Sequence, residues 1–113
     1  MKKVVLADDN YIVSEGIKLN INWNELNAEI VLIAKSGQEV LNYIIDNHVD
    51  LIITDIEMPN LNGISLSREA IKINPYIKII LISAYDKFEY AKQAVSIGVY
   101  DYIEKPIDYD FLY

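Results

Sequence analysis

The sequence predicts an α/β fold, in which parallel strands are joined by crossover helices. Two observations support this fold class. First, five short runs of β-branched or aliphatic residues recur along the 113-residue chain. Second, the segments between these runs have helical period, and such alternation is typical of a parallel sheet covered by helices. The expected strands are KVVLA (3–7), EIVLIA (29–34), LIIT (51–54), IKIILIS (77–83) and YDYIE (100–104).

Two of the expected helices carry capping signals. Ser36 and Glu39, three residues apart, form a capping box that should begin the helix after the second strand. Asp86 and Glu89 repeat this pattern after the fourth strand. Gly98 then stands where a C′ glycine would end that helix.

The other helices follow from periodicity alone. Residues 11–21 have helical period after the first strand, and residues 65–73 have it after the third. Asn74 and Pro75 should end the second of these helices. A last helix should begin near Asp108, and we expect the chain to end inside this truncated fifth helix.

Length and composition indicate a single domain, residues 1–113. A hydrophobic content of 52% suits one core. The net charge of −7 and the scattered basic residues argue against nucleic-acid binding by this chain itself. The absence of cysteine agrees with a reducing cytoplasm, where we expect the protein. We expect no membrane association, because no apolar run approaches the roughly 20 residues of a membrane helix.

Polar side chains follow four of the five expected strands. In a parallel α/β sheet these strand ends lie along one edge, where ligands bind. Three carboxylates, one hydroxyl and one ammonium group should therefore meet at that edge. They belong to Asp8, Asp9, Asp55, Ser83 and Lys105.

This combination favours a magnesium site. Clustered carboxylates repel one another, and a hard, oxygen-liking cation such as Mg²⁺ would relieve that repulsion. Lys105 adds a second positive charge, which could pair with Asp55 and later with a phosphoryl oxygen. Each signal alone has an ordinary interpretation, because an Asp-Asp-Asn run often caps a helix and a lysine before proline is often solvated. Their occurrence together at consecutive strand ends makes coincidence a poor explanation.

The same residues resemble the receiver domain of two-component response regulators. The motifs ADDN (7–10), TDIEMPNLNG (54–63), LISA (81–84) and YIEKP (102–106) stand in the order and spacing of that family. The resemblance covers essentially the whole chain. It implies a doubly wound, flavodoxin-like, five-stranded parallel sheet with strand order 2-1-3-4-5.

The resemblance further implies a phosphorylation switch that depends on Mg²⁺. Asp55 would accept a phosphoryl group from a phosphohistidine of a partner sensor histidine kinase. Asp8, Asp9, Asp55 and the backbone carbonyl of Glu57 would bind the metal. The domain would catalyse only its own phosphorylation and dephosphorylation, and it would not act as an enzyme on other substrates.

The remaining site residues are implied to hold the phosphoryl group and to relay its arrival. Lys105 would bind one phosphoryl oxygen, and Ser83 would move its hydroxyl onto another. Tyr102 matches the aromatic residue that changes rotamer as this happens. The surface formed by the fourth helix, the fifth strand and the fifth helix would then be the output face, and activation could proceed through a homodimer.

One segment resembles a particular subfamily. Residues 81–107, LISAYDKFEYAKQAVSIGVYDYIEKPI, look like this region of regulators that have an AraC-type helix-turn-helix output domain. The resemblance implies regulation of transcription by an output domain that this chain does not contain. Contact with DNA would come only from that domain.

Two alternatives remain open. A magnesium-dependent phosphatase with an aspartyl-phosphate intermediate also needs paired acids and a lysine, and Glu57 lies two residues after Asp55, where such enzymes carry a general acid. The short chain argues against it, and sustained turnover on phosphate esters would favour it. An unphosphorylated pseudo-receiver of the same fold is the second alternative. The presence of all five polar site residues argues against that one.

Overall fold

The structure is a computed structural model that describes residues 2–58, 61–83 and 88–104. Five strands alternate with four helices over these ranges. The strands are β1 (Lys2–Ala7), β2 (Ala28–Ala34), β3 (Leu51–Asp55), β4 (Lys78–Ser83) and β5 (Asp101–Glu104). The helices are α1 (Tyr11–Asn20), α2 (Gly37–Asp46), α3 (Gly63–Ile73) and α4 (Phe88–Ile97).

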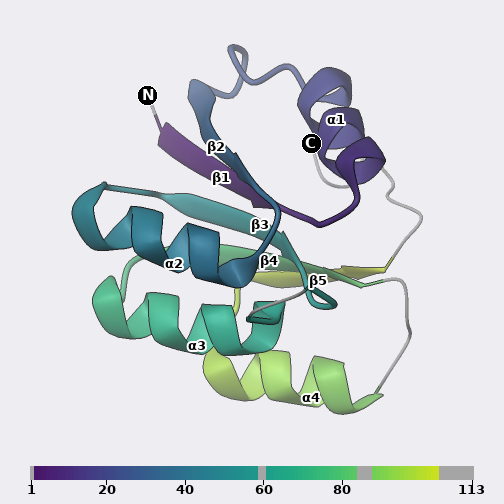
Figure 1. Cartoon of the computed structure of the whole chain (residues 1–113), viewed down its shortest axis with the longest axis vertical. Coiled ribbons are helices and arrows are strands. Elements are labelled where there is room, and N and C mark those ends of the chain that lie inside the picture. Colours follow the sequence, from purple (N-terminus) through teal and green to yellow (C-terminus); the bar gives the residue numbers. More distant parts are fainter. Residues whose placement is uncertain (1, 59–60, 84–87, 105–113) are drawn as a thin grey trace.

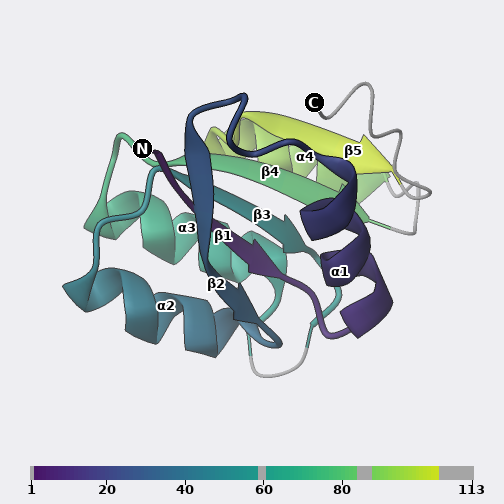
Figure 2. The same cartoon turned by 90° about the horizontal axis from the view of Figure 1, so that it is seen from above.

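The five strands form one parallel sheet of order β2-β1-β3-β4-β5. Helix α1 lies on one face of this sheet, and α2, α3 and α4 lie on the other (Figure 1 and Figure 2). The predicted α/β fold and strand order are therefore confirmed. The last helix, expected near Asp108, lies outside the described residues. None of the helices in the described ranges combines the length and the apolar character that crossing a bilayer requires.

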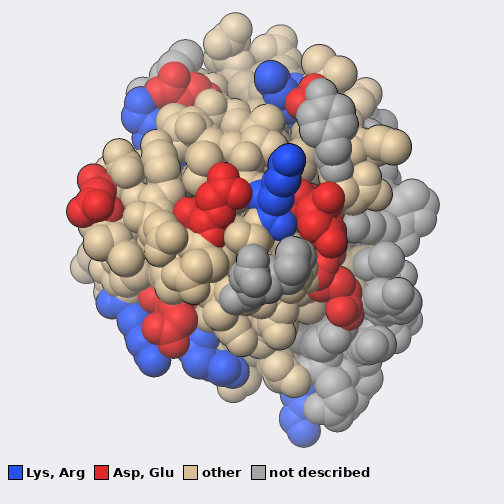
Figure 3. Space-filling view, in the orientation of Figure 1, with Lys and Arg blue, Asp and Glu red and all other residues tan. Residues whose placement is uncertain are grey.

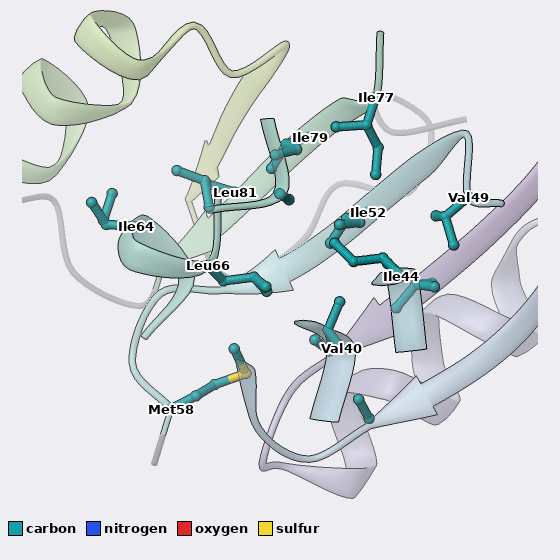
Figure 4. Packing of buried hydrophobic residues seen from close by; sticks show 14 of the residues in the cluster. Val40, Ile44, Val49, Ile52, Met58, Ile64, Leu66, Ile77, Ile79 and Leu81 are labelled. Atoms are coloured by element: carbon teal, nitrogen blue, oxygen red, sulfur yellow. The ribbon is translucent and has the colours of Figure 1, made fainter. Parts of the chain in front are cut away.

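Each face of the sheet has its own apolar core, because successive side chains of a strand point to opposite faces. Ile52 of β3 packs on the side of α2 and α3, in one cluster with Val40 and Leu66 (Figure 4). The next residue, Ile53, belongs to a second cluster with Ile17 of α1. All five side chains are at most 3% exposed. Burial of each of these side chains contributes about 1.5–3 kcal/mol to the free energy of unfolding, which helps to fix the strands in register.

The structure shows two of the predicted helix ends, at Ser36 and Gly98. Ser36 caps α2 as predicted, since its Oγ accepts a hydrogen bond from the Glu39 N–H at 3.3 Å. The Glu39 carboxylate reaches back to the Lys35 N–H at 3.1 Å, one residue before the N–H that a standard capping box uses. Gly98 has a φ of 90°, as expected of a glycine that ends a helix. The predicted cap at Asp86 lies outside the described residues.

Helix α3 begins earlier than the periodicity predicts. It starts at Gly63, two residues before the expected first residue, Ser65. The reason is Asn62, whose side-chain oxygen accepts a hydrogen bond from the Ser65 N–H at 2.9 Å and so caps the helix. The first turn of α3 therefore lies directly beside the end of β3.

Asp50 joins three strands at the amino edge of the sheet. Its carboxylate accepts a hydrogen bond from the Lys3 N–H at 2.8 Å and lies 2.8 Å from the Nε2 of His48. Its own N–H donates to the Lys3 carbonyl of β1 at 2.9 Å, and its carbonyl accepts from the Lys78 N–H of β4 at 3.0 Å. The Lys3 N–H, followed by His48, lowers the pKa of the Asp50 carboxyl below its usual value.

The substitution Asp50→Asn should lower the free energy of unfolding by about 1 kcal/mol at pH 7, because the amide keeps an acceptor oxygen but loses the charge. The folded-state pKa of Asp50 is depressed, so its stabilisation is present above the unfolded carboxyl pKa of about 4 and is lost as the pH falls through the folded value. Urea unfolding at pH 7 and pH 3 checks this. The exposed Asp46→Asn is the control, and a difference that does not shrink at pH 3 contradicts the prediction.

Candidate functional site

Three carboxylates lie together where β1 and β3 end. One carboxylate oxygen from each of Asp8, Asp9 and Asp55 lies within 4.8 Å of the other two. Asp8 and Asp55 are each only 5% exposed, whereas Asp9 is exposed. The strand order thus brings together the three acids that the sequence places after the first and third strands.

The loop between β1 and α1 positions the first two acids. The Asp8 N–H donates to the Ala34 carbonyl at 3.1 Å, which continues the β1–β2 ladder by one residue. The Asp8 carboxylate accepts the Asn10 N–H at 2.8 Å, and the Asn10 side chain in turn caps α1 by accepting the Ile12 N–H at 3.0 Å. The capping interpretation of this run is therefore correct for Asn10. This capping role is compatible with a metal site, because Asp9 remains exposed beside Asp8 and Asp55.

The backbone of Asp55 is enclosed from two sides. Its carbonyl oxygen accepts a hydrogen bond from the Thr54 hydroxyl at 2.9 Å. On the other side a Cβ built onto Gly63 would lie 2.3 Å from that same oxygen, so only glycine lets α3 begin here. Ile56 and Gly63 are held by two hydrogen bonds, from the Ile56 N–H to the Ile82 carbonyl at 3.1 Å and from the Gly63 N–H to the Ile56 carbonyl at 2.9 Å.

The structure describes some of the other predicted site residues in full and others only in part or not at all. Ser83 is fully buried at the end of β4, one residue beyond Ile82, which pairs with Asp55. Glu57 is exposed, two residues after Asp55. Tyr102 lies in β5 opposite Leu81, but only its backbone is described. Lys105 lies outside the described residues.

The charge around the strand ends suits a cation. Acidic side chains gather toward the right of the face seen in Figure 3, over the ends of β1 and β3. Two of the three clustered carboxylates are buried, where repulsion between like charges is stronger than in water. Carboxylate and carbonyl oxygens are the ligands that Mg²⁺ prefers, and this donor set contains no sulfur or imidazole group. The residues present therefore fit a magnesium ion.

Sequence reasoning missed the structural roles of two glycines. Gly63 begins α3 against Asp55, and Gly37 begins α2 against Leu61. One signal could have found them, because glycine is a poor helix former and yet opens both helices.

A doubly wound parallel sheet with three acids at its carboxyl edge defines a flavodoxin-like domain that has an oxygen-rich ligand site. The chain belongs to the response regulator receiver domain family, which matches residues 4–113. The resemblance noted from the sequence motifs is thereby confirmed. Receiver domains are signalling modules that work with histidine kinases, and they are not enzymes in the usual sense.

The curated relatives are transcriptional regulators. The transcriptional regulatory protein HptR from Staphylococcus aureus (strain NCTC 8325 / PS 47) is 38% identical over 109 residues, which are 96% of this chain and 42% of HptR. The transcriptional regulatory protein YesN from Bacillus subtilis (strain 168) is 35% identical over 106 residues, which are 94% of this chain and 29% of YesN. The chain thus spans less than half the length of these relatives.

A solved structure agrees with the fold. The REC domain of AraT, a response regulator from Geobacillus stearothermophilus, is 40% identical and superposes with a TM-score of 0.91. The match covers 98% of this chain and 86% of that one.

Proposed function

We propose that this chain is the phosphoryl-accepting switch of a two-component transcriptional regulator, with Asp55 as the acceptor for a sensor histidine kinase. The observation that carries the proposal is the acid cluster, in which the nearly buried Asp55 lies beside Asp8 and Asp9 at the end of β3. Membership of the receiver family supports the same assignment.

Asp8, Asp9, Asp55 and the backbone carbonyl of Glu57 would hold Mg²⁺. The oxygen-only donor set supports this assignment. When bound, the cation would offset the charge of both the carboxylates and the incoming phosphoryl group. The exposed position of Asp9 leaves the cluster open to solvent on that side, so a cation can enter without unfolding.

The chemical step is an in-line displacement at phosphorus. A carboxylate oxygen of Asp55 attacks the phosphorus, the phosphorus–nitrogen bond of the phosphohistidine breaks, and the electron pair returns to the imidazole. Lys105 would bind one oxygen of the transferred group. Ser83, whose strand β4 pairs with β3, would donate its hydroxyl to another.

The output of the switch would pass through the surface of α4, β5 and the helix that follows. Tyr102 would change rotamer when Ser83 moves, and a homodimer could form on this surface. The curated relatives are transcriptional regulators of greater length, which supports an output domain outside this chain. We infer an AraC-type helix-turn-helix domain as the part that contacts DNA, and a cytoplasmic location for the whole protein.

A mass measurement tests the proposal. Incubation with acetyl phosphate and Mg²⁺ should add a single phosphoryl group to the intact protein, and removal of the metal should prevent this. Asp55→Ala should take up none. The matched control is Asp46→Ala, an exposed carboxylate of α2 that should leave the adduct unchanged. A folded wild-type protein without an adduct would contradict the proposal and favour a pseudo-receiver.

The same protein sample also tests the alternative that the chain is a magnesium-dependent phosphatase. Glu57 is exposed two residues after Asp55, where a general acid of such an enzyme would lie. Sustained release of phosphate from esters, over many turnovers, would support that activity. A single adduct without release would support the switch.

A further inference from the structure

The junction between β2 and α2, residues 34–37, contributes none of the three clustered carboxylates and yet touches both segments that carry them. On one side the carbonyl of Ala34 accepts the Asp8 N–H at 3.1 Å. On the other side Gly37 packs against Leu61, which lies between Asp55 and α3. A Cβ built onto Gly37 would lie 2.2 Å from the Leu61 carbonyl oxygen and 2.9 Å from the Leu61 Cβ.

This contact cannot be relieved by turning a side chain. The atom in the way is a backbone carbonyl, so any larger residue in place of Gly37 must move the chain at Leu61. Leu61 is two residues from Gly63, whose N–H donates to the Ile56 carbonyl at 2.9 Å. A shift of Leu61 is therefore passed to the residues that directly follow Asp55.

The position of Gly37 is itself fixed. Gly37 is buried at the first position of α2. Ser36 caps this turn through the Glu39 N–H, and the Glu39 carboxylate binds the Lys35 N–H. The turn that carries Gly37 is thus held at both ends, and the loop after β3 must adapt to it.

We propose that Gly37 is a positioning residue for the metal and phosphoryl site. Its missing side chain allows Leu61 to approach the β2–α2 junction, which sets the place of the Glu57 carbonyl relative to Asp8 and Asp55. The inference rests on the proposed function, because it assigns Gly37 a role in Mg²⁺-dependent phosphoryl acceptance.

The substitution Gly37→Ala should weaken Mg²⁺ binding about tenfold, the size of effect expected when the support of a metal ligand is disturbed. The phosphorylation rate with acetyl phosphate should fall by a similar factor at low Mg²⁺ and by less at saturating Mg²⁺. In the metal-free protein the amide resonances of Ile56 and Gly63 should shift. The measurements are a Mg²⁺ titration by calorimetry, rates from intact mass, and an amide NMR spectrum.

Two further variants keep the test decisive. Ile44→Val is the matched control, because Ile44 is a buried residue of the same helix two turns further on, and it should bind Mg²⁺ as the wild type does. Ser36→Ala removes the cap without adding an atom. If Gly37→Ala does not fold, Ser36→Ala should still show a smaller loss of Mg²⁺ affinity in the same direction.

The outcomes separate the inference from the proposed function. Wild-type Mg²⁺ affinity in Gly37→Ala, or an equal loss in Ile44→Val, would overturn the role of Gly37. Absence of an adduct in the wild type would instead overturn the proposed function. In that case unshifted amides of Ile56 and Gly63 in Gly37→Ala would overturn the loop contact as well, and shifted amides would support it.

Discussion

Replacing Asp8 by asparagine is expected to stabilise the metal-free protein and to weaken Mg²⁺ binding at the same time. Asp8 is buried within 4.8 Å of two other carboxylates, so removing its charge should raise the free energy of unfolding by about 1 kcal/mol. Asparagine keeps an oxygen that can accept the Asn10 N–H, so the turn into α1 should persist. Excess Mg²⁺ should reverse the order, because a ligand at free concentration L that binds only the folded protein stabilises it by RT ln(1 + L/Kd), which is larger for the tighter-binding wild type.

Urea unfolding at pH 7, with and without Mg²⁺, measures both effects. Asp46→Asn is the control, since this exposed carboxylate lies at the far end of α2 and should respond to Mg²⁺ as the wild type does. Lower stability of Asp8→Asn in the absence of metal would show that the carboxylates do not repel one another in the folded protein. An equal gain on adding Mg²⁺ would remove Asp8 from the metal site.

The second large effect is expected for Gly63→Ala, which should lower the free energy of unfolding by about 3 kcal/mol. The added Cβ would lie 2.3 Å from the Asp55 carbonyl oxygen and 3.0 Å from the Ile56 Cα. The Thr54 hydroxyl already occupies another approach to that carbonyl, so β3 has little room to yield. Helix α3 must therefore move away, and phosphoryl acceptance by Asp55 should be lost.

Thermal or urea unfolding gives the stability, and the intact mass after acetyl phosphate treatment gives the acceptance. Ser65→Ala is the matched control in the same turn of α3, because the cap there uses the Ser65 backbone N–H. It should remain close to the wild type in both measurements. Wild-type stability in Gly63→Ala would mean that α3 can slide along its axis at no cost.

Much of the fold could be predicted from the sequence because its signals are local. Buried parallel strands are apolar on both faces, so runs such as Leu51 to Thr54 are visible without knowledge of their neighbours. The Ser36 cap is likewise a property of four consecutive residues. The predicted start of α3 at Ser65 was wrong because Asn62 caps the helix, which therefore begins at Gly63.

The acid cluster was predictable for a different reason. The carboxyl ends of parallel strands share one edge, so topology alone brings Asp55 to Asp8 and Asp9. The contact of Gly37 with Leu61 was not predictable, because it depends on how two loops approach each other in space. The arrangement of Lys105 stays a prediction, since this residue lies outside the described residues. The side chain of Tyr102 also stays a prediction, since only the backbone of that residue is described.

The hydrogen bonds of Asp50 suggest how such a site can be tolerated. They tie β1, β3 and β4 together at the edge of the sheet that is remote from the acid cluster. Strand register is thus secured by groups that take no part in signalling. The opposite edge contributes less to the register, so it can hold the mutually repelling charges of the acid cluster.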